Sequence, residues 1–145
     1  MRTFFQTKEA ALKNRKWILI DAENKIVGRV ASEVAAILRG KNNPAFTPHN
    51  DDGDFVIVVN AAKIKFSGNK EKDKLYHVHS GYVSGLRTDT VSDLRQQKPE
   101  EIMKRAVWGM LPHTALGRRQ LKKLKIFAGA EHIHAAQTPE LTSSL

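Results

Sequence analysis

The stretch 27–40 reads VGRVASEVAAILRG, and the spacing of its apolar residues decides the class of fold. These residues recur at intervals of three and four, which is typical of a helix with one apolar face. They are Val27, Val30, Ala31, Val34, Ala35 and Leu38. The helix is expected to stop at Gly40, because glycine readily adopts the left-handed conformation that ends many helices.

Two short apolar runs flank this helix and are expected to be strands. The first is WILI at 17–20, which the turn-like residues 21–24 follow. A loop over 41–54 separates the helix from the second run, FVIVV at 55–59. A continuous β-branched run of this kind is typical of a strand that is buried on both faces of a parallel sheet. Strand, helix and strand together predict a βαβ unit within an α/β fold.

The rest of the chain contains no linker and no internal repeat, so residues 1–145 are expected to form a single domain. Residues 1–16 are expected to be a basic N-terminal arm or short helix, and residues 128–145 an extended C-terminal tail. The other expected elements are a turn at 67–70, a strand at 75–79, a loop at 81–85, helices at 88–97 and 99–110, a helix from Thr114 to about Lys125 and a short strand at 126–127.

Composition excludes several classes of protein. Hydrophobic residues make up 41% of the 145 residues, enough for a buried core. The absence of cysteine excludes a disulfide framework, a thiolate zinc site and a cysteine nucleophile. The apolar runs, such as 55–59, are far shorter than the roughly 18 residues that indicate a membrane span. No apolar signal-peptide core follows the first residues. We therefore expect a soluble, cytoplasmic protein without a membrane partner.

The distribution of charge is more informative than its total. The formal net charge is +9, which suggests a polyanionic partner, most often a nucleic acid. Residues 102–130 contain seven basic residues and no acidic residue, and the first 20 residues carry a net charge of +4. The remainder of the chain is close to neutral. The excess charge is therefore expected to lie on a localised surface.

A helix over 114–125 would place its basic side chains on one arc and Leu121 and Leu124 outside it. The basic residues are Arg118, Arg119, Lys122, Lys123 and Lys125. An ordinary solvated helix usually mixes both signs of charge to form ion pairs, and this segment contains no acidic partner. We interpret the helix as a surface for the phosphate backbone of RNA or DNA.

Metal-binding and catalytic patterns are weaker. The pairs His77, His79 and His132, His134 have the spacing of two ligands, but nothing marks the third and fourth ligands that zinc or iron requires. The acidic residues in 51–54 lack the spacing of a calcium loop and are expected to form a turn that balances nearby Lys or Arg. No glycine-rich phosphate loop follows the first strand. A nucleotide-dependent enzyme and a metal-dependent hydrolase are the alternatives; we expect no enzymatic activity, no cofactor and no small-molecule substrate.

The aromatic residues divide into two groups. Trp17, Phe55 and Phe127 are expected in the core. Tyr76 and Tyr82 lie in a polar, glycine-containing stretch with histidines, where they could stack on unpaired bases, as in many RNA-binding proteins. For Trp108 the sequence leaves two alternatives open, the core or a partner surface.

A series of short segments occurs in a specific order along the chain. They are WILIDA at 17–22, VGRVASEVAAILRGK at 27–41, FTP at 46–48, SGNK at 67–70, HSGY at 79–82, VWGMLP at 107–112, LGR at 116–118, LKIFAG at 124–129, HIH at 132–134 and AQTP at 136–139. In this order and spacing they resemble the bacterial form of the large-subunit ribosomal protein L-thirteen family. His113 departs from the family pattern, which typically has lysine after Met-Leu-Pro.

The resemblance implies a three-layer α/β/α domain with a mainly parallel four-stranded sheet, a basic helical C-terminal region and an extended tail. It also implies a structural constituent of the large ribosomal subunit that binds ribosomal RNA directly, 23S in bacteria, and supports early subunit assembly. Neighbouring large-subunit ribosomal proteins are further expected partners, and the protein's own messenger RNA is a possible one. The expected location is the cytoplasmic ribosome, with a mature organellar ribosome as the alternative.

The residues expected to contact RNA combine the basic helix with the family segments. They are Lys41, Lys70, His77, His79, Tyr82, Arg87, Lys104, Arg105, His113, Arg118, Arg119, Lys122, Lys123, Lys125, His132 and His134.

Overall fold

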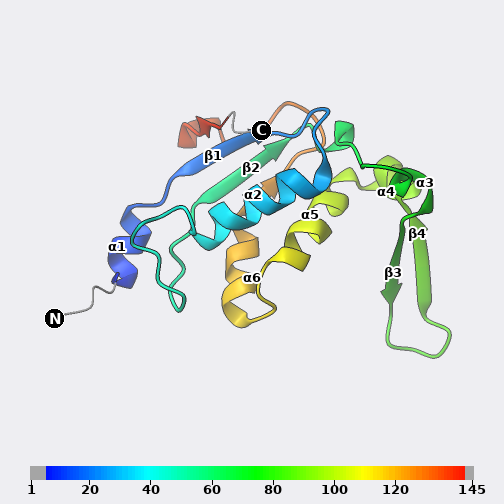
Figure 1. Ribbon diagram of the computed structural model, residues 1–145, viewed down its shortest axis with the longest axis horizontal. Helices are drawn as coiled ribbons and strands as arrows, with labels where there is room; N and C mark the ends of the chain where they lie inside the picture. The colour runs from blue at the N-terminus through cyan, green and yellow to red at the C-terminus, as the bar shows by residue number, and fades with distance from the viewer. Residues whose placement is uncertain (1–5, 143–145) are drawn as a thin grey trace.

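The predicted βαβ unit forms the centre of the protein (Figure 1). The structure is a computed structural model that describes residues 6–142. In it β1 (Trp17–Asp21) leads into α2 (Val27–Arg39), and β2 (Phe55–Val59) then pairs parallel with β1. The helix ends at Gly40, as its sequence predicts.

The sheet has four strands in the order β5-β2-β1-β6, and all neighbours are parallel. β5 (Leu124–Ile126) pairs with β2, and β6 (Glu140–Leu141) pairs with the outer edge of β1. The mainly parallel four-stranded sheet is therefore confirmed. Its fourth strand comes from the tail, which was expected only to be extended.

One face of the sheet carries the main core. Alternate strand residues on this face pack against α2, α5 (Pro99–Met110) and α6 (Ala115–Lys122), which lie below the sheet in Figure 1. The residues from the sheet are Ile18, Ile20, Val56, Val58, Leu124 and Ile126. Their period of two follows from the alternation of side chains along a strand.

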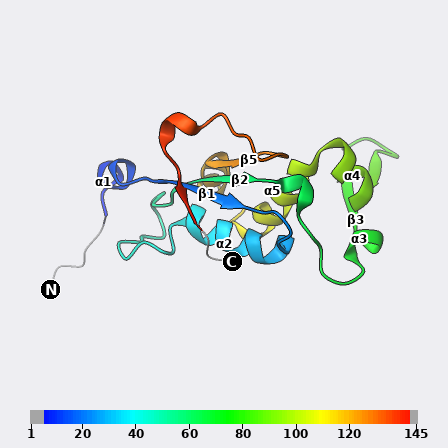
Figure 2. The same cartoon turned by 90° about the horizontal axis from the view of Figure 1, so that it is seen from above.

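The other face is covered by the chain that follows β5. Trp17 and Phe55 stack there with ring centroids 4.3 Å apart, and Ile57 beside them is fully buried. His134 packs on Trp17 at 5.1 Å and on Phe127 at 5.9 Å. It lies just before the short helix η2 (Ala135–Gln137), which Figure 2 shows on the opposite side of the strands from α2. The fold thus has three layers, with the C-terminal segment as the third.

The remaining elements lie at the two ends of the sheet. α1 (Lys8–Lys13) belongs to the basic arm, of which residues 1–5 lie outside the described part, as do 143–145 of the tail. Beyond β2 come η1 (Ala61–Lys63), α3 (Lys70–Asp73) and an antiparallel hairpin that stands away from the body (Figure 1). The hairpin strands are β3 (Leu75–His79) and β4 (Leu86–Thr90), and α4 (Val91–Gln97) follows them.

Two predicted helix boundaries are wrong. The helix expected over 88–97 begins only at Val91, because Thr90 and Asp93 form a reciprocal capping box and the residues before it pair with β3. The helix expected to reach Lys125 ends at Lys122, and β5 follows almost at once. In both cases a strand pairing overrides the local preference for helix, within the hairpin for β4 and with the distant strand β2 for β5.

Gly53 offers a test of how tightly the loop before β2 packs on α2. A Cβ at this position would collide with the carbonyl group of Leu38, whereas a Cβ on Gly129 would meet open space. Gly53→Ala should therefore lower the free energy of unfolding by about 2 kcal/mol or more, the usual cost of overpacking. Gly129→Ala, the matched control, should leave it unchanged or slightly raised. Urea unfolding followed by tryptophan fluorescence measures both, and equal midpoints would contradict the close contact.

Candidate nucleic-acid interface

α6 presents three exposed cations on its outer side: Arg118, Arg119 and Lys122. None of the ion pairs formed within residues 6–142 involves these side chains. The inner side of the helix buries Gln120 and packs Leu121 against the core. The predicted separation of a basic arc from an apolar side is therefore confirmed for this part of the segment.

Local contacts at the start of α6 fix its direction. The hydroxyl of Thr114 accepts a hydrogen bond from the backbone N–H of Gly117 at 3.3 Å, which confirms Thr114 as the N-cap. Gly117 lies directly against Pro112, and a Cβ here would collide with the Pro112 carbonyl oxygen. The turn before the helix therefore packs on the helix itself.

The prediction that Lys123 contacts RNA is wrong, because its side chain points into the protein. Only 4% of the residue is exposed. Its ammonium Nζ donates to Asp51 Oδ1 at 2.6 Å and to the Gly53 carbonyl oxygen at 2.7 Å. A third bond, of 3.3 Å, reaches the carbonyl oxygen of Leu38 at the end of α2. With its three donors engaged by the protein, this lysine has none left for a phosphate, and we remove it from the interface.

The acidic turn has the role that its sequence predicts, since it balances nearby cations. Arg15 donates to Asp51 Oδ2 and to the Asp51 carbonyl oxygen, each at 2.9 Å, so this carboxylate joins two cations. Burial lowers the pKa of Lys123 from its ordinary value of 10.5, while the hydrogen bond and charge of Asp51 act in the opposite direction.

Lys125 and His113 flank the basic helix without belonging to it. Lys125 lies on β5, where alternation directs it to the sheet face opposite that of Leu124, and it is half-buried. His113 is exposed, with its ring centroid 4.5 Å from that of Trp108. Trp108 itself packs against the core, which decides between the two alternatives left open for it.

Lys104 and Arg105 share an intramolecular partner. Lys104 Nζ lies 3.2 Å from a carboxylate oxygen of Glu101, and Arg105 Nε lies 3.7 Å from the other. Arg105 also stands 5.2 Å from the ring centroid of Tyr76, at the base of the hairpin. Burial raises the pKa of the Tyr76 phenol, and the charge of Arg105 partly offsets this effect. Arg105 therefore attaches the hairpin to α5.

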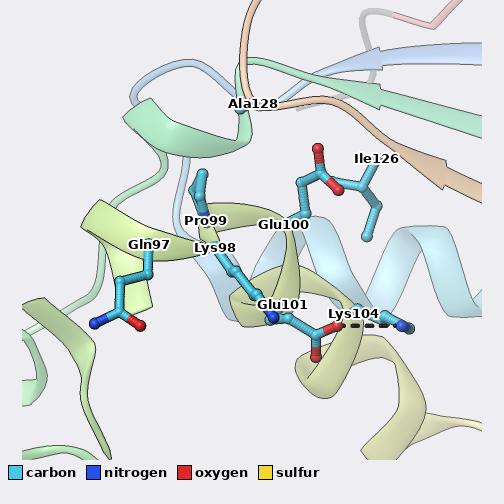
Figure 3. A pocket seen from close by; sticks show the side chains of 8 residues that line it. All are labelled: Gln97, Lys98, Pro99, Glu100, Glu101, Lys104, Ile126 and Ala128. Atoms are coloured by element: carbon cyan, nitrogen blue, oxygen red, sulfur yellow. Dashed lines mark hydrogen bonds and ion pairs between the residues drawn. The ribbon is translucent and has the colours of Figure 1, made fainter. Parts of the chain in front are cut away.

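A hollow of about 490 Å³ lies where α5 begins, beside β5 (Figure 3). Glu100 and Glu101 line it together with Lys98 and Lys104, and Figure 3 shows the Lys104 side chain joined to Glu101. Two carboxylates in the wall oppose the binding of a phosphate group. This hollow therefore gives no support to the alternative of a nucleotide-dependent enzyme.

The hairpin carries four of the predicted residues. His77 lies 2.9 Å from the Thr88 hydroxyl, and His79 Nδ1 accepts from the Gly81 backbone N–H at 3.0 Å. Arg87 pairs with Asp89 across 2.8 Å but remains largely exposed. Tyr82 stands at the tip with 80% of its surface exposed. The hairpin thus projects an aromatic ring with polar and basic neighbours.

His132 and His134 pack against aromatic side chains of the sheet and of the segment after it. Their rings approach Phe127 at 6.3 and 5.9 Å, and both residues are half-buried. They hold the C-terminal segment on the sheet, far from the exposed end of the hairpin that carries His77 and His79. Between residues 6 and 142 no three His, Cys, Asp or Glu side chains are grouped so as to hold a metal ion.

The structure also brings together two cations that the predicted set of RNA-contacting residues does not contain, Arg29 and Lys74. Arg29 lines a hollow together with Lys70 and Lys74. The sequence offers only Val27-Gly28-Arg29 at this point, which is too short for a phosphate-binding motif. The remaining predicted residue, Lys41, is exposed just beyond the end of α2.

Comparison with known proteins identifies the family of this chain. The family model described as "Ribosomal protein L13" matches residues 15–133. The chain belongs to the ribosomal protein L13 family. It is 52% identical over 140 residues to the large ribosomal subunit protein uL13 of Staphylococcus epidermidis, covering 97% of this chain and 96% of that protein. It is 57% identical to the protein of the same name from Chlorobaculum parvum over 125 residues, or 86% and 83% of the two chains.

Members of this family are ribosomal proteins, which are structural components rather than enzymes. Of the helices described between residues 6 and 142, none is both long and apolar enough to span a membrane.

The buried ammonium group of Lys123 can be tested by removing its charge. Lys123→Met should lower the free energy of unfolding by about 3 kcal/mol, because Asp51 and two carbonyl groups lose their shared donor. Lys122→Met, one residue away on the exposed side, should change it by less than about 0.5 kcal/mol. Chemical denaturation of the two variants measures the difference. Similar values for both would show that Lys123 is not buried as described.

Proposed function

We propose that this protein is a structural constituent of the large ribosomal subunit and binds the ribosomal RNA of that subunit directly. The observation that carries the proposal is the row of exposed cations on α6, which form no ion pair within residues 6–142. The stretch 102–130 around them contains no acidic residue. The names of its relatives, which are large-subunit proteins, support the same function. The ribosome of the cytoplasm is the proposed location.

The contacts on α6 suit the sugar–phosphate backbone rather than base edges. Arg118 and Arg119 are planar donors that match phosphate oxygens, and Lys122 adds a point charge on the same side of the helix. Lys41 and His113 are further exposed donors, whereas Tyr82 on the hairpin would stack on an unpaired base. Neighbouring ribosomal proteins would then meet the surfaces that the RNA leaves free.

A role early in assembly follows from contacts of this kind. A folded protein that neutralises phosphates on closely packed RNA helices lowers the repulsion between them before the subunit is complete. Binding to the protein's own messenger RNA would use the same cations, and the assay below applies to that RNA as well.

Removing the three exposed cations of α6 tests the proposal. The variant Arg118→Ala, Arg119→Ala, Lys122→Ala should bind a large-subunit ribosomal RNA transcript more weakly. The slope of log K against log salt should fall by about 0.9 for each lost phosphate contact. Filter binding between 50 and 300 mM potassium chloride measures that slope.

The control for this experiment removes three other exposed lysines: Lys13, Lys72 and Lys98. It has the same net charge as the α6 variant, so a general loss of electrostatic attraction would affect both alike. An α6 variant with the slope of the control would contradict the assignment of this helix. A wild-type protein that stayed out of the large subunit during sedimentation of a lysate at low salt would contradict the function itself.

A further inference from the structure

A second basic surface lies beside the first turn of α2. A hollow of about 430 Å³ opens there between α2 and the segment that leads into α3. Its wall contains three cations, Arg29, Lys70 and Lys74, and the apolar ring of Phe66, but no carboxylate. It therefore differs from the hollow at the start of α5, where Glu100 and Glu101 are part of the wall.

The cations of this hollow form no ion pair with any other residue in the described part of the chain. They are Arg29, Lys70 and Lys74. The nearest contacts of the lysines are weak ones, since Lys70 donates to the Ser67 hydroxyl at 3.4 Å and Lys74 lies 5.1 Å from the ring centroid of Tyr76.

Two acidic residues, Glu71 and Asp73, lie beside these lysines in sequence, and neither lines the hollow. Glu71 lies 2.8 Å from Arg95, which also donates to the carbonyl oxygens of Ala62 and Ile64. The carboxylate is thereby tied to α4 and to the segment after β2. Three positive side chains around a hollow without a negative one form a site for an anionic group of phosphate size.

The hollow lies at the start of α2, and the end of α6 packs near the other end of the same helix. Val27 and Arg29, at the start of this helix, line the hollow, whereas Lys123 at the end of α6 bonds to Leu38 near its other end. Eleven residues separate Val27 from Leu38, and at 1.5 Å per residue this places the two points about 16 Å apart along the axis. The two basic surfaces are therefore attached to different ends of the same helix.

We infer that the hollow binds a backbone phosphate of ribosomal RNA, so that the protein holds two separate segments of the RNA at once. The inference rests on the proposed RNA-binding function and adds a second site to it. A free nucleotide or inorganic phosphate would present the same chemistry to the hollow. The presence of a second basic surface at a distance favours the polymer, because one polyanion can occupy both.

Binding measurements on a variant of the hollow test this inference. Arg29→Ala, Lys70→Ala, Lys74→Ala should weaken binding to the large-subunit RNA transcript at least tenfold at 150 mM salt and reduce the salt slope by about 0.9, the value for one lost phosphate contact. The variant lacking Lys13, Lys72 and Lys98 is again the matched control, since none of these lysines lines the hollow. Thermal unfolding confirms that each variant is folded.

The possible results separate the inference from the function on which it rests. If only the α6 variant loses affinity and the hollow variant behaves as the control does, the hollow is not an RNA site. If ATP or inorganic phosphate binds the wild type stoichiometrically and not the hollow variant, the ligand is a free phosphate compound, and the inference is wrong. If the wild type does not bind the transcript at all, the proposed RNA-binding function is wrong, and the inference that rests on it is wrong as well.

The absence of cysteine allows a direct map of both segments. Ser67→Cys at the hollow and Ala115→Cys at the start of α6 each give a single attachment point for an iron chelate that cleaves nearby RNA. Two different sets of cleaved nucleotides are expected in the bound transcript. Cleavage from Cys at position 115 alone, or the same nucleotides from both positions, would overturn the inference of two segments.

Discussion

One buried ammonium group, that of Lys123, holds together the parts of this protein that surround its basic surface. Its three hydrogen bonds join the end of α6 to the last turn of α2 and to the loop 41–54. Arg15 adds the N-terminal arm through the second oxygen of Asp51. Because an unpaired buried charge is costly, separating any of these parts is unfavourable, and α6 is presented at a fixed angle.

The same principle divides the positive charge of the chain into two groups. Lys123, Arg15, Arg95 and Arg105 are directed at carboxylates, carbonyl groups or an aromatic ring of the protein itself. Among the residues that the structure describes, the cations on the outer side of α6 and around the hollow have no ion-pair partners. The second group is available to a polyanion, together with further exposed cations such as Lys41.

The fold was more predictable than the interface. The strand at 55–59, the helix ending at Gly40 and the cap at Thr114 depend on neighbours in sequence, and all three are confirmed. The pairing of the tail with β1 depends on a contact between residues more than a hundred positions apart, as Ile18 and Glu140 show. The interface was less predictable, because Arg118 and Lys123 lie in one basic run of the sequence. In the structure Arg118 is exposed, whereas Lys123 is buried.

The sequence by itself determined the α/β class, the position of the basic segment and the family to which the chain is similar. These features follow from periodicity, composition and the order of short motifs, which are local properties. Only the tertiary structure decided which cations face outward, which acidic groups neutralise them and where two distant segments form a common hollow. A charge acts on whatever lies within a few ångströms of it, and chain folding alone brings Arg29 to Lys74, or Lys123 to Asp51.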